Sequence, residues 1–193
     1  MGDLFAQPDD ATPLTPEEQR DLIPNLAYRG ELNEAEQENI ARGQDWALGR
    51  RRDLLHEKFI RDLHKRMFGD VWRWAGKFRA TERNLGVPFY EIPVALRQLL
   101  DDGKTWIEYK TFPPDEIGVR FHHRLVQIHP FPNGNGRHAR LMADLLVMQL
   151  GEERFSWGRA NLQKVSDVRR GYIDALRAAD HHDMQPLLEF ARS

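Results

Sequence analysis

Two apolar helical segments joined by a short, rigid turn constrain the fold of this chain more than any other feature. Residues 114–128 place four apolar side chains on one helical face (Ile117, Phe121, Leu125 and Ile128). A second apolar stretch follows over residues 135–150 (with Leu141, Met142, Leu145 and Leu146). At the junction, the eight residues 129–136 hold two prolines and two glycines. Such a turn is rigid and permits positive φ at Gly134 and Gly136. The pattern predicts a helix, a tight turn and a second helix.

Helical patterns also fill most of the remaining chain. We expect a short helix that Thr15 and Glu18 cap, and longer helices over residues 33–48, 52–68, 94–109, 161–179 and 183–191. Asn33 is the expected cap of the first of these longer helices. One segment favours β-structure, because residues 78–81 and 87–90 flank Asn84-Leu85-Gly86. The sequence therefore predicts an all-α fold with one small β-hairpin.

Composition and charge exclude several classes of protein. The formal charge of −2 argues against a nucleic-acid-binding surface. The absence of cysteine excludes disulfides and thiol catalysis, and it fits a reducing cytosol. Residues 1–10 have neither a basic start nor an apolar run, and no stretch approaches the ~20 apolar residues of a membrane span. We therefore expect a cytoplasmic protein without direct contacts to nucleic acid or a membrane.

The turn between the two apolar helices predicts an anion-binding site. It delivers the backbone N–H groups of Gly134, Asn135 and Gly136 to a helix N-terminus, where donors lack helical partners and the helix dipole favours negative charge. Arg137 adds a guanidinium group that can bind phosphate oxygens in a bidentate way, and Arg140 adds a second. At the start of the turn lies His129, whose imidazole can accept a proton from an attacking hydroxyl.

These residues also carry a family resemblance. The run from His129 to Arg140 resembles the signature of the Fic (Fic/Doc, or Fido) family, His-x-Phe-x-(Asp/Glu)-Gly-Asn-Gly-Arg-x-x-Arg, and departs from it at one position. Residues 74–79 are similar to the segment that enters the flap hairpin of the family, and residues 170–176 resemble one of its C-terminal helices. With residues 29–33, the chain looks closest to the subgroup called mobile mystery protein B.

The resemblance implies a fold, a reaction and a role for each motif residue. Family members usually transfer AMP from ATP to a Ser, Thr or Tyr hydroxyl of a target protein, with Mg²⁺. On that model His129 is the catalytic base, Arg137 grips the β- and γ-phosphates, and Arg140 supports the anion site. Phe131 would be buried and hold the turn. The hairpin at Arg79–Ile92 would be a flap on which the target protein docks as an added strand.

The same resemblance divides the chain into three parts. Residues 1–30 form an N-terminal arm with a short helix, residues 31–50 a candidate inhibitory helix region, and residues 51–193 a Fic-type helical core domain. Many relatives are inhibited by a helix whose glutamate pairs with the second motif arginine, here Arg140. Glu36 and Glu38 are the candidates for that glutamate. Alternatively, Glu36 closes a capping box with Asn33.

The position that departs from the signature is Asn133, which replaces the metal-binding acid of the family. An amide oxygen can ligate Mg²⁺ but brings no charge, whereas Mg²⁺ favours carboxylates and phosphates. We therefore expect Mg²⁺ to be held mainly by the nucleotide phosphates, with Asn133 as a weak or water-mediated ligand.

Other readings of the sequence stay open. The same fold could transfer a different phosphoryl-linked group or remove AMP, or the chain could be a catalytically weak nucleotide-binding regulatory module. Two histidine pairs, at 122–123 and 181–182, could be metal ligands, but adjacent residues do not share a helical face. We expect solvated or capping roles for them. The target protein, the modified residue and the oligomeric state do not follow from the sequence.

Overall fold

The described part of the chain is helical. A computed structural model describes residues 4–5, 13–158 and 165–193. These ranges contain α1 (Pro16–Arg20), α2 (Arg29–Leu48), α3 (Glu57–Phe68), the 3-10 turn η1 (Phe89–Glu91), α4 (Ile92–Glu108), α5 (Pro114–Ile128), α6 (Asn135–Gln149), α7 (Val165–Asp180) and α8 (Gln185–Arg192). The predicted all-α class is confirmed. Residues 1–3 and 6–12 of the predicted arm and the start of the helix predicted at 161–179 lie outside the described residues.

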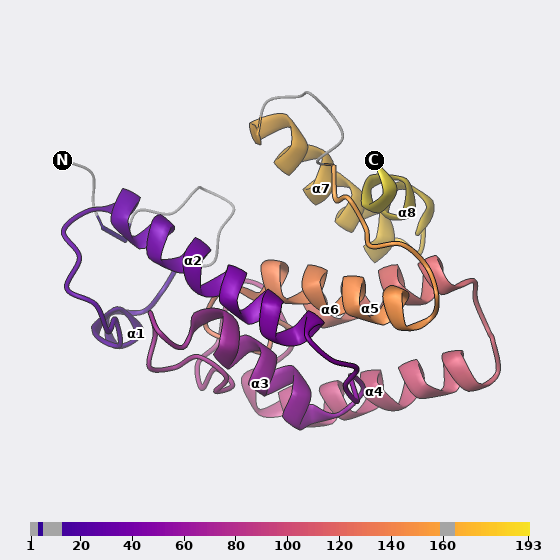
Figure 1. Ribbon diagram of the computed structural model, residues 1–193, viewed down its shortest axis with the longest axis horizontal. Coiled ribbons are helices and arrows are strands. Elements are labelled where there is room, and N and C mark those ends of the chain that lie inside the picture. Colours follow the sequence, from indigo (N-terminus) through magenta and orange to yellow (C-terminus); the bar gives the residue numbers. More distant parts are fainter. Residues whose placement is uncertain (1–3, 6–12, 159–164) are drawn as a thin grey trace.

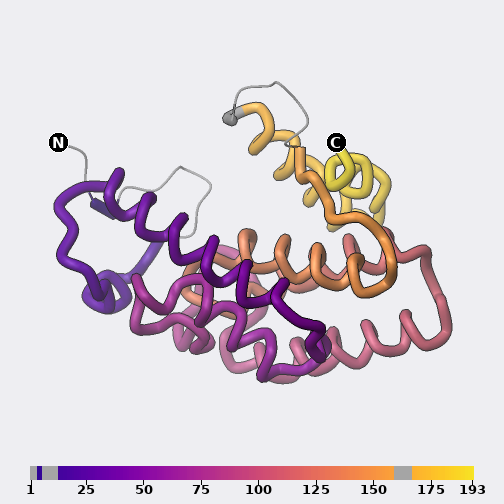
Figure 2. Tube along the Cα trace, viewed as in Figure 1, coloured from indigo at the N-terminus to yellow at the C-terminus, as the bar shows by residue number. Residues whose placement is uncertain are grey.

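The helices form a bundle with a smaller pair packed on one side. α2 crosses in front of α3 and α6, and α4 runs below α5 (Figure 1). α5 and α6 are packed neighbours on either side of the motif turn. α7 and α8 lie together above α5 and α6 (Figure 2). Over the described ranges, no helix has the length and apolar character that crossing a membrane requires.

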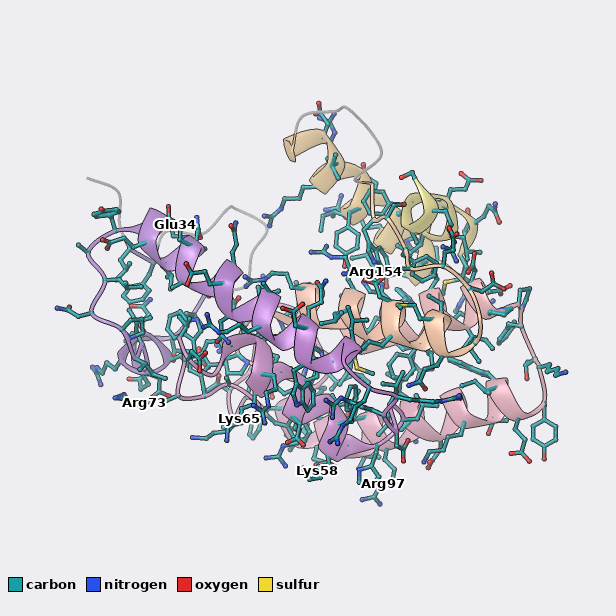
Figure 3. All side chains as sticks on the ribbon, in the orientation of Figure 1. Glu34, Lys58, Lys65, Arg73, Arg97 and Arg154 are labelled. Carbon is teal, nitrogen blue, oxygen red and sulfur yellow. The ribbon has the colours of Figure 1, made fainter. Side chains whose placement is uncertain are left out.

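Two clusters of buried apolar side chains correspond to these two parts. The larger core is built by α2 to α6 and the loop that follows α3, and it includes Leu32, Phe68, Trp72 and Phe131. The smaller core joins α7 and α8 to one face of α5 and α6. Arg154, labelled in Figure 3, fixes the loop before α7 because its Nε donates to the buried carboxylate of Asp144 at 2.7 Å. Phe131 of the motif turn belongs to the larger core.

The predicted N-terminal helix is confirmed, together with its capping box. Glu18 N–H donates to the Thr15 hydroxyl at 3.3 Å, and Thr15 N–H donates to the Glu18 carboxylate at 2.8 Å. The segment after α1 pairs with the loop after α3, since the N–H of Arg73 donates to the Asp21 carbonyl at 3.0 Å. Glu18 also forms a buried ion pair with Arg83. The arm is thus fastened to the segment in which the flap was predicted.

The predicted β-hairpin is wrong as a secondary structure. Residues 80–88, which we call the flap loop, contain no strand, and η1 follows them directly. Instead of pairing with each other, the carbonyls of Thr81 and Val87 both accept hydrogen bonds from the Arg79 guanidinium. Pro88 has no N–H to give to a ladder. The side chain of Arg79 therefore takes the place of the cross-strand hydrogen bonds.

The predicted cap of the second helix is also wrong. α2 begins at Arg29 with Tyr28 as its N-cap, so Asn33 lies inside the helix. Glu36 is consequently not a capping residue. It lies on the buried face of α2, where it is 6% exposed.

Candidate functional site

The motif turn has the backbone conformation that its glycines allow. α5 ends at Ile128, and His129 then adopts a left-handed conformation with φ 52°. Gly134 has φ 79° and forms the N-cap of α6. A Cβ at Gly134 would lie 2.6 Å from the Phe68 ring, so this position needs glycine for space as well as for conformation. Gly136 lies inside α6, so its predicted freedom to adopt positive φ is not used.

Asn135 braces the turn with its side chain. Its Oδ1 accepts from the Phe131 N–H at 3.0 Å, and its Nδ2 donates to the Phe131 carbonyl at 2.8 Å. The amide is buried and occupied, so Asn135 can offer a bound anion only its backbone N–H. Phe131 is fully buried, as the family resemblance implied. These contacts fix the shape of the turn before any ligand arrives.

His64 is a site residue that the sequence reasoning missed. Its Nδ1 accepts from the Gly76 N–H and its Nε2 donates to the Asn133 carbonyl, both at 3.0 Å. A neutral ring with the proton on Nε2 satisfies both partners. The ring stacks on Phe131 with 3.8 Å between centroids. The available signal was its spacing, since His64 follows Ile60 by four residues on the apolar face of α3.

His129 is the candidate base, and its surroundings keep it neutral. Burial lowers its pKa to about 4, and the charges of Arg79 and Arg83 act in the same direction. A hydrogen bond to the Val126 carbonyl opposes these effects. Because that bond uses an N–H of the ring, the other nitrogen of the neutral imidazole carries a lone pair that can accept a proton. Gly86 of the flap loop lies against the side chain, since a Cβ there would be 2.7 Å from the His129 Cβ.

Arg137 meets the candidate inhibitory residue Glu36. Its Nη1 donates to Glu36 Oε2 at 2.6 Å, while Trp72 Nε1 donates to Glu36 Oε1 at 2.8 Å. The prediction that Glu36 contacts Arg140 is therefore wrong in its partner, although the glutamate does reach the motif. Glu38 is not at the site. It is exposed and lies 3.9 Å from Arg42, because residues two apart point to opposite sides of a helix.

Arg140 lies on the side of the turn that faces the C-terminal helices. Its guanidinium carbon is 5.2 Å from the centroid of the Tyr172 ring. The Tyr172 hydroxyl is hydrogen-bonded to Nε2 of His122 at 3.1 Å. His122 and His123 are both buried, so the prediction of solvated or capping roles is wrong for this pair. Nε2 of His123 pairs with Asp180 at 2.8 Å, whereas His181 and His182 are exposed.

Asn133 lies in the turn with its amide oxygen occupied. Oδ1 accepts from the Gly134 N–H at 2.7 Å and from Arg137 Nη2 at 3.3 Å. Within the described residues, no group of three or more His, Asp or Glu side chains is arranged to hold a metal ion. The turn therefore offers backbone donors and arginines, which suit phosphate oxygens better than a cation.

Two buried histidines of the motif predict a loss of stability in acid. Burial lowers the pKa of His129 and of His138 to about 4, from 6.5 for an unperturbed histidine. Between these values the unfolded chain binds more protons than the folded chain, so the free energy of unfolding falls as the pH falls from 6.5 to 4. We expect each histidine to contribute a loss of about 2 kcal/mol between pH 7 and pH 5.

Urea unfolding of wild type and His138→Gln at pH 7 and pH 5 measures this loss. The variant should lose less stability on acidification than the wild type, whereas His181→Gln should match the wild type because its side chain is exposed. Equal losses in the wild type and His138→Gln would contradict the prediction.

A family model and several curated relatives match this chain, and all of them belong to the Fic/DOC family. The model of the Fic/DOC family matches residues 54–147. A curated protein adenylyltransferase Fic from Aedes aegypti is 31% identical over 142 residues, which are 72% of this chain and 27% of the relative. Protein adenylyltransferase fic-1 of Caenorhabditis elegans is 27% identical over 147 residues, with 74% and 28% coverage. The chain thus spans about a quarter of the length of the curated relatives that it matches.

Solved structures show the same fold. Fic-1 from C. elegans superposes with a TM-score of 0.62 and 26% identity, covering 91% of this chain and 52% of that chain. The BepC protein from Bartonella tribocorum, solved with bound AMPPNP, gives a TM-score of 0.69 at 17% identity, covering 92% of this chain and 97% of that chain. The second likeness concerns the fold alone.

Proposed function

Because this chain belongs to the Fic/DOC family, we propose that it transfers AMP from ATP to a Ser, Thr or Tyr hydroxyl of another protein. The observation that carries the proposal is the neutral, buried His129 at the start of a turn that ends in the N-terminus of α6. A base and an anion-binding helix end are the two groups that nucleotidyl transfer to a hydroxyl requires. Named relatives with this activity support the same reaction.

In the proposed step, the target hydroxyl oxygen attacks the α-phosphorus of ATP. A new O–P bond forms while the bond from the α-phosphorus to the oxygen bridging to the β-phosphate breaks. Pyrophosphate leaves with that bonding pair, and the hydroxyl proton passes to the imidazole nitrogen of His129 that carries no proton, which later releases it to water. The N–H groups of the turn and Arg137 would hold the phosphates.

Labelled ATP tests the reaction itself. The purified chain is incubated with cell lysate and ATP labelled at the α- or the γ-phosphate, and protein-bound label is measured after gel separation. AMP transfer predicts label on protein from the α-position only. Label from the γ-position alone would indicate phosphoryl transfer, and release of AMP from a modified protein would indicate the reverse reaction. ATP binding without any labelled protein would favour a regulatory module.

We also propose that Glu36 restrains this activity. Its carboxylate accepts a hydrogen bond from Nη1 of Arg137, a group that would otherwise be available to the nucleotide phosphates. The indole N–H of Trp72 holds the carboxylate in place. A phosphate would have to displace the carboxylate before Arg137 could serve the nucleotide. The site of action is therefore the first arginine of the motif rather than the second.

Mg²⁺ enters the proposal with the nucleotide. The turn does not fit a dedicated metal site, because the amide oxygen of Asn133 already accepts two hydrogen bonds and brings no charge. We propose that any Mg²⁺ is held by the phosphates of ATP, with Asn133 at most a weak ligand.

Asn133→Asp tests the role of this position. A carboxylate here should lower the Mg²⁺ concentration for half-maximal activity by roughly 10-fold, since Mg²⁺ prefers charged oxygen ligands. The measurement is a Mg²⁺ titration of the labelled-ATP assay on both proteins. If the variant gains neither activity nor metal affinity, position 133 does not face the metal.

The docking site of the target is proposed at Arg79–Ile92. Exposed apolar side chains gather on this segment and the first turn of α4, namely Leu85, Phe89, Tyr90 and Val94. They give a partner protein an apolar surface near His129.

We propose that the activity is cytosolic, a setting with which the absence of cysteine from the sequence is compatible.

A further inference from the structure

One buried arginine connects the flap loop to the candidate base. Arg79 is 3% exposed, and its side-chain donors point at main-chain carbonyls. Nε donates to the His129 carbonyl at 2.7 Å, and Nη1 donates to the Thr81 carbonyl at 2.9 Å. Nη2 donates to the Val87 carbonyl. A single rigid guanidinium therefore holds residues at both ends of the flap loop and the backbone of the motif.

The backbone that Arg79 holds is in an unfavourable conformation. His129 has φ 52° in the left-handed region, which costs a residue with a side chain about 1–2 kcal/mol. Such a conformation persists only where the surroundings fix it. Two hydrogen bonds of Arg79 do so here, because its N–H also donates to the Pro130 carbonyl at 2.9 Å. The carbonyls of two consecutive residues, His129 and Pro130, are therefore both fixed by Arg79.

The flap loop packs into the same contact. A Cβ at Gly86 would lie 2.7 Å from Arg79 Nη2 and 2.7 Å from the His129 Cβ, so the loop backbone touches both residues. Two positive side chains of this region act on the imidazole, Arg79 and Arg83. The charge of Arg83 is paired with Glu18 of α1, and Glu82 lies near Arg79.

We propose that Arg79 is the positioning residue of the catalytic base: it fixes the left-handed backbone of His129 and the flap loop as one unit. Arg79 contacts the motif turn through the carbonyls of His129 and Pro130, and it acts on the reaction through His129. The inference rests on the proposed function for its catalytic meaning, but its structural content is independent of the reaction. The proposal explains why Arg79 is buried: its side chain holds the backbone of the motif as well as the flap loop.

Histidine NMR tests the structural content without any substrate. The ring signals of His129 and His138 are followed from pH 7 to pH 3 in wild type, Arg79→Gln, Arg79→Lys and the surface control Arg97→Gln. Arg97 lies on α4 and is labelled in Figure 3. Loss of the charge and of the packing should raise the midpoint of His129 by roughly one pH unit in Arg79→Gln. The midpoint of His138 should stay fixed in every variant, because Arg79 does not act on it.

Activity measurements then test the positioning role. Arg79→Lys keeps the charge but loses the planar set of donors, so we expect a roughly 10- to 100-fold lower kcat with little change in the KM for ATP. Arg97→Gln should retain wild-type values. An unmoved His129 midpoint in a folded Arg79→Gln protein, or a wild-type kcat for Arg79→Lys, would overturn the inference. If no protein transfers AMP but the His129 midpoint moves as expected, the proposed function fails and the coupling of Arg79 to His129 stands.

Discussion

His129→Ala is expected to reduce AMP transfer by about 10²–10⁴-fold while the protein still binds ATP. The loss follows because the variant removes the lone pair that would accept the hydroxyl proton, but leaves the turn and Arg137 in place. Transfer is measured with α-labelled ATP, and binding is measured separately by calorimetry. Equal activity of wild type and variant would rule out His129 as the base.

The backbone of His129 calls for a second substitution. Alanine is disfavoured at φ 52°, whereas asparagine adopts the left-handed region more readily and also lacks a useful base. His129→Asn should therefore fold at least as well as His129→Ala and be equally inactive. If only the alanine variant loses activity, the defect lies in the backbone and not in proton transfer.

In wild type, the low pKa of His129 predicts that its protonation limits the rate only at acid pH, near its pKa of about 4.

Glu36→Gln should raise the initial rate of modification by about 10- to 100-fold. A hydrogen bond between charged groups contributes about 1.5–3 kcal/mol, and each 1.4 kcal/mol corresponds to a factor of ten. Glutamine keeps the shape of the side chain and an oxygen for Trp72 Nε1, but it removes the charge that holds Arg137. The rate is measured as self-modification and as modification of lysate proteins at subsaturating ATP.

Glu38→Gln is the matched control. The same chemical change on the exposed side of α2, two residues away, should leave the rate unchanged. An increase in both variants would point to a general effect of negative charge on α2. No increase in Glu36→Gln, with folding verified by thermal unfolding, would contradict restraint through Arg137.

The helices of this fold could be predicted from periodicity because each buries one apolar stripe. Residues 114–128 were expected to be helical and form α5, and the helix expected from residue 135 is α6. Caps were less predictable. Thr15 and Glu18 formed the expected box, whereas Asn33 did not cap α2, because helical backbone continues past it to Arg29. A good capping residue is not required where packing extends the helix.

The site was predictable where one segment contains it and not where distant segments meet. His129, Gly134 and Arg137 lie within one run of sequence, and the structure gathers them around one turn. The partner of Glu36 is 101 residues away, so no local pattern could decide between Arg137 and Arg140. The flap failed as a hairpin for a similar reason. The carbonyls of Thr81 and Val87 accept hydrogen bonds from the Arg79 side chain, and strand propensities take no account of such an interaction.

Glu36 and Arg137 belong to the same chain, so a nucleotide phosphate that binds Arg137 competes with an intramolecular carboxylate. An intramolecular partner acts at a fixed effective concentration, of the order of millimolar for a flexible link and higher for a preformed one. Dilution of the protein cannot relieve such a restraint, but a competing anion at sufficient concentration can. The chain would therefore respond to the abundance of nucleotide rather than to its own abundance.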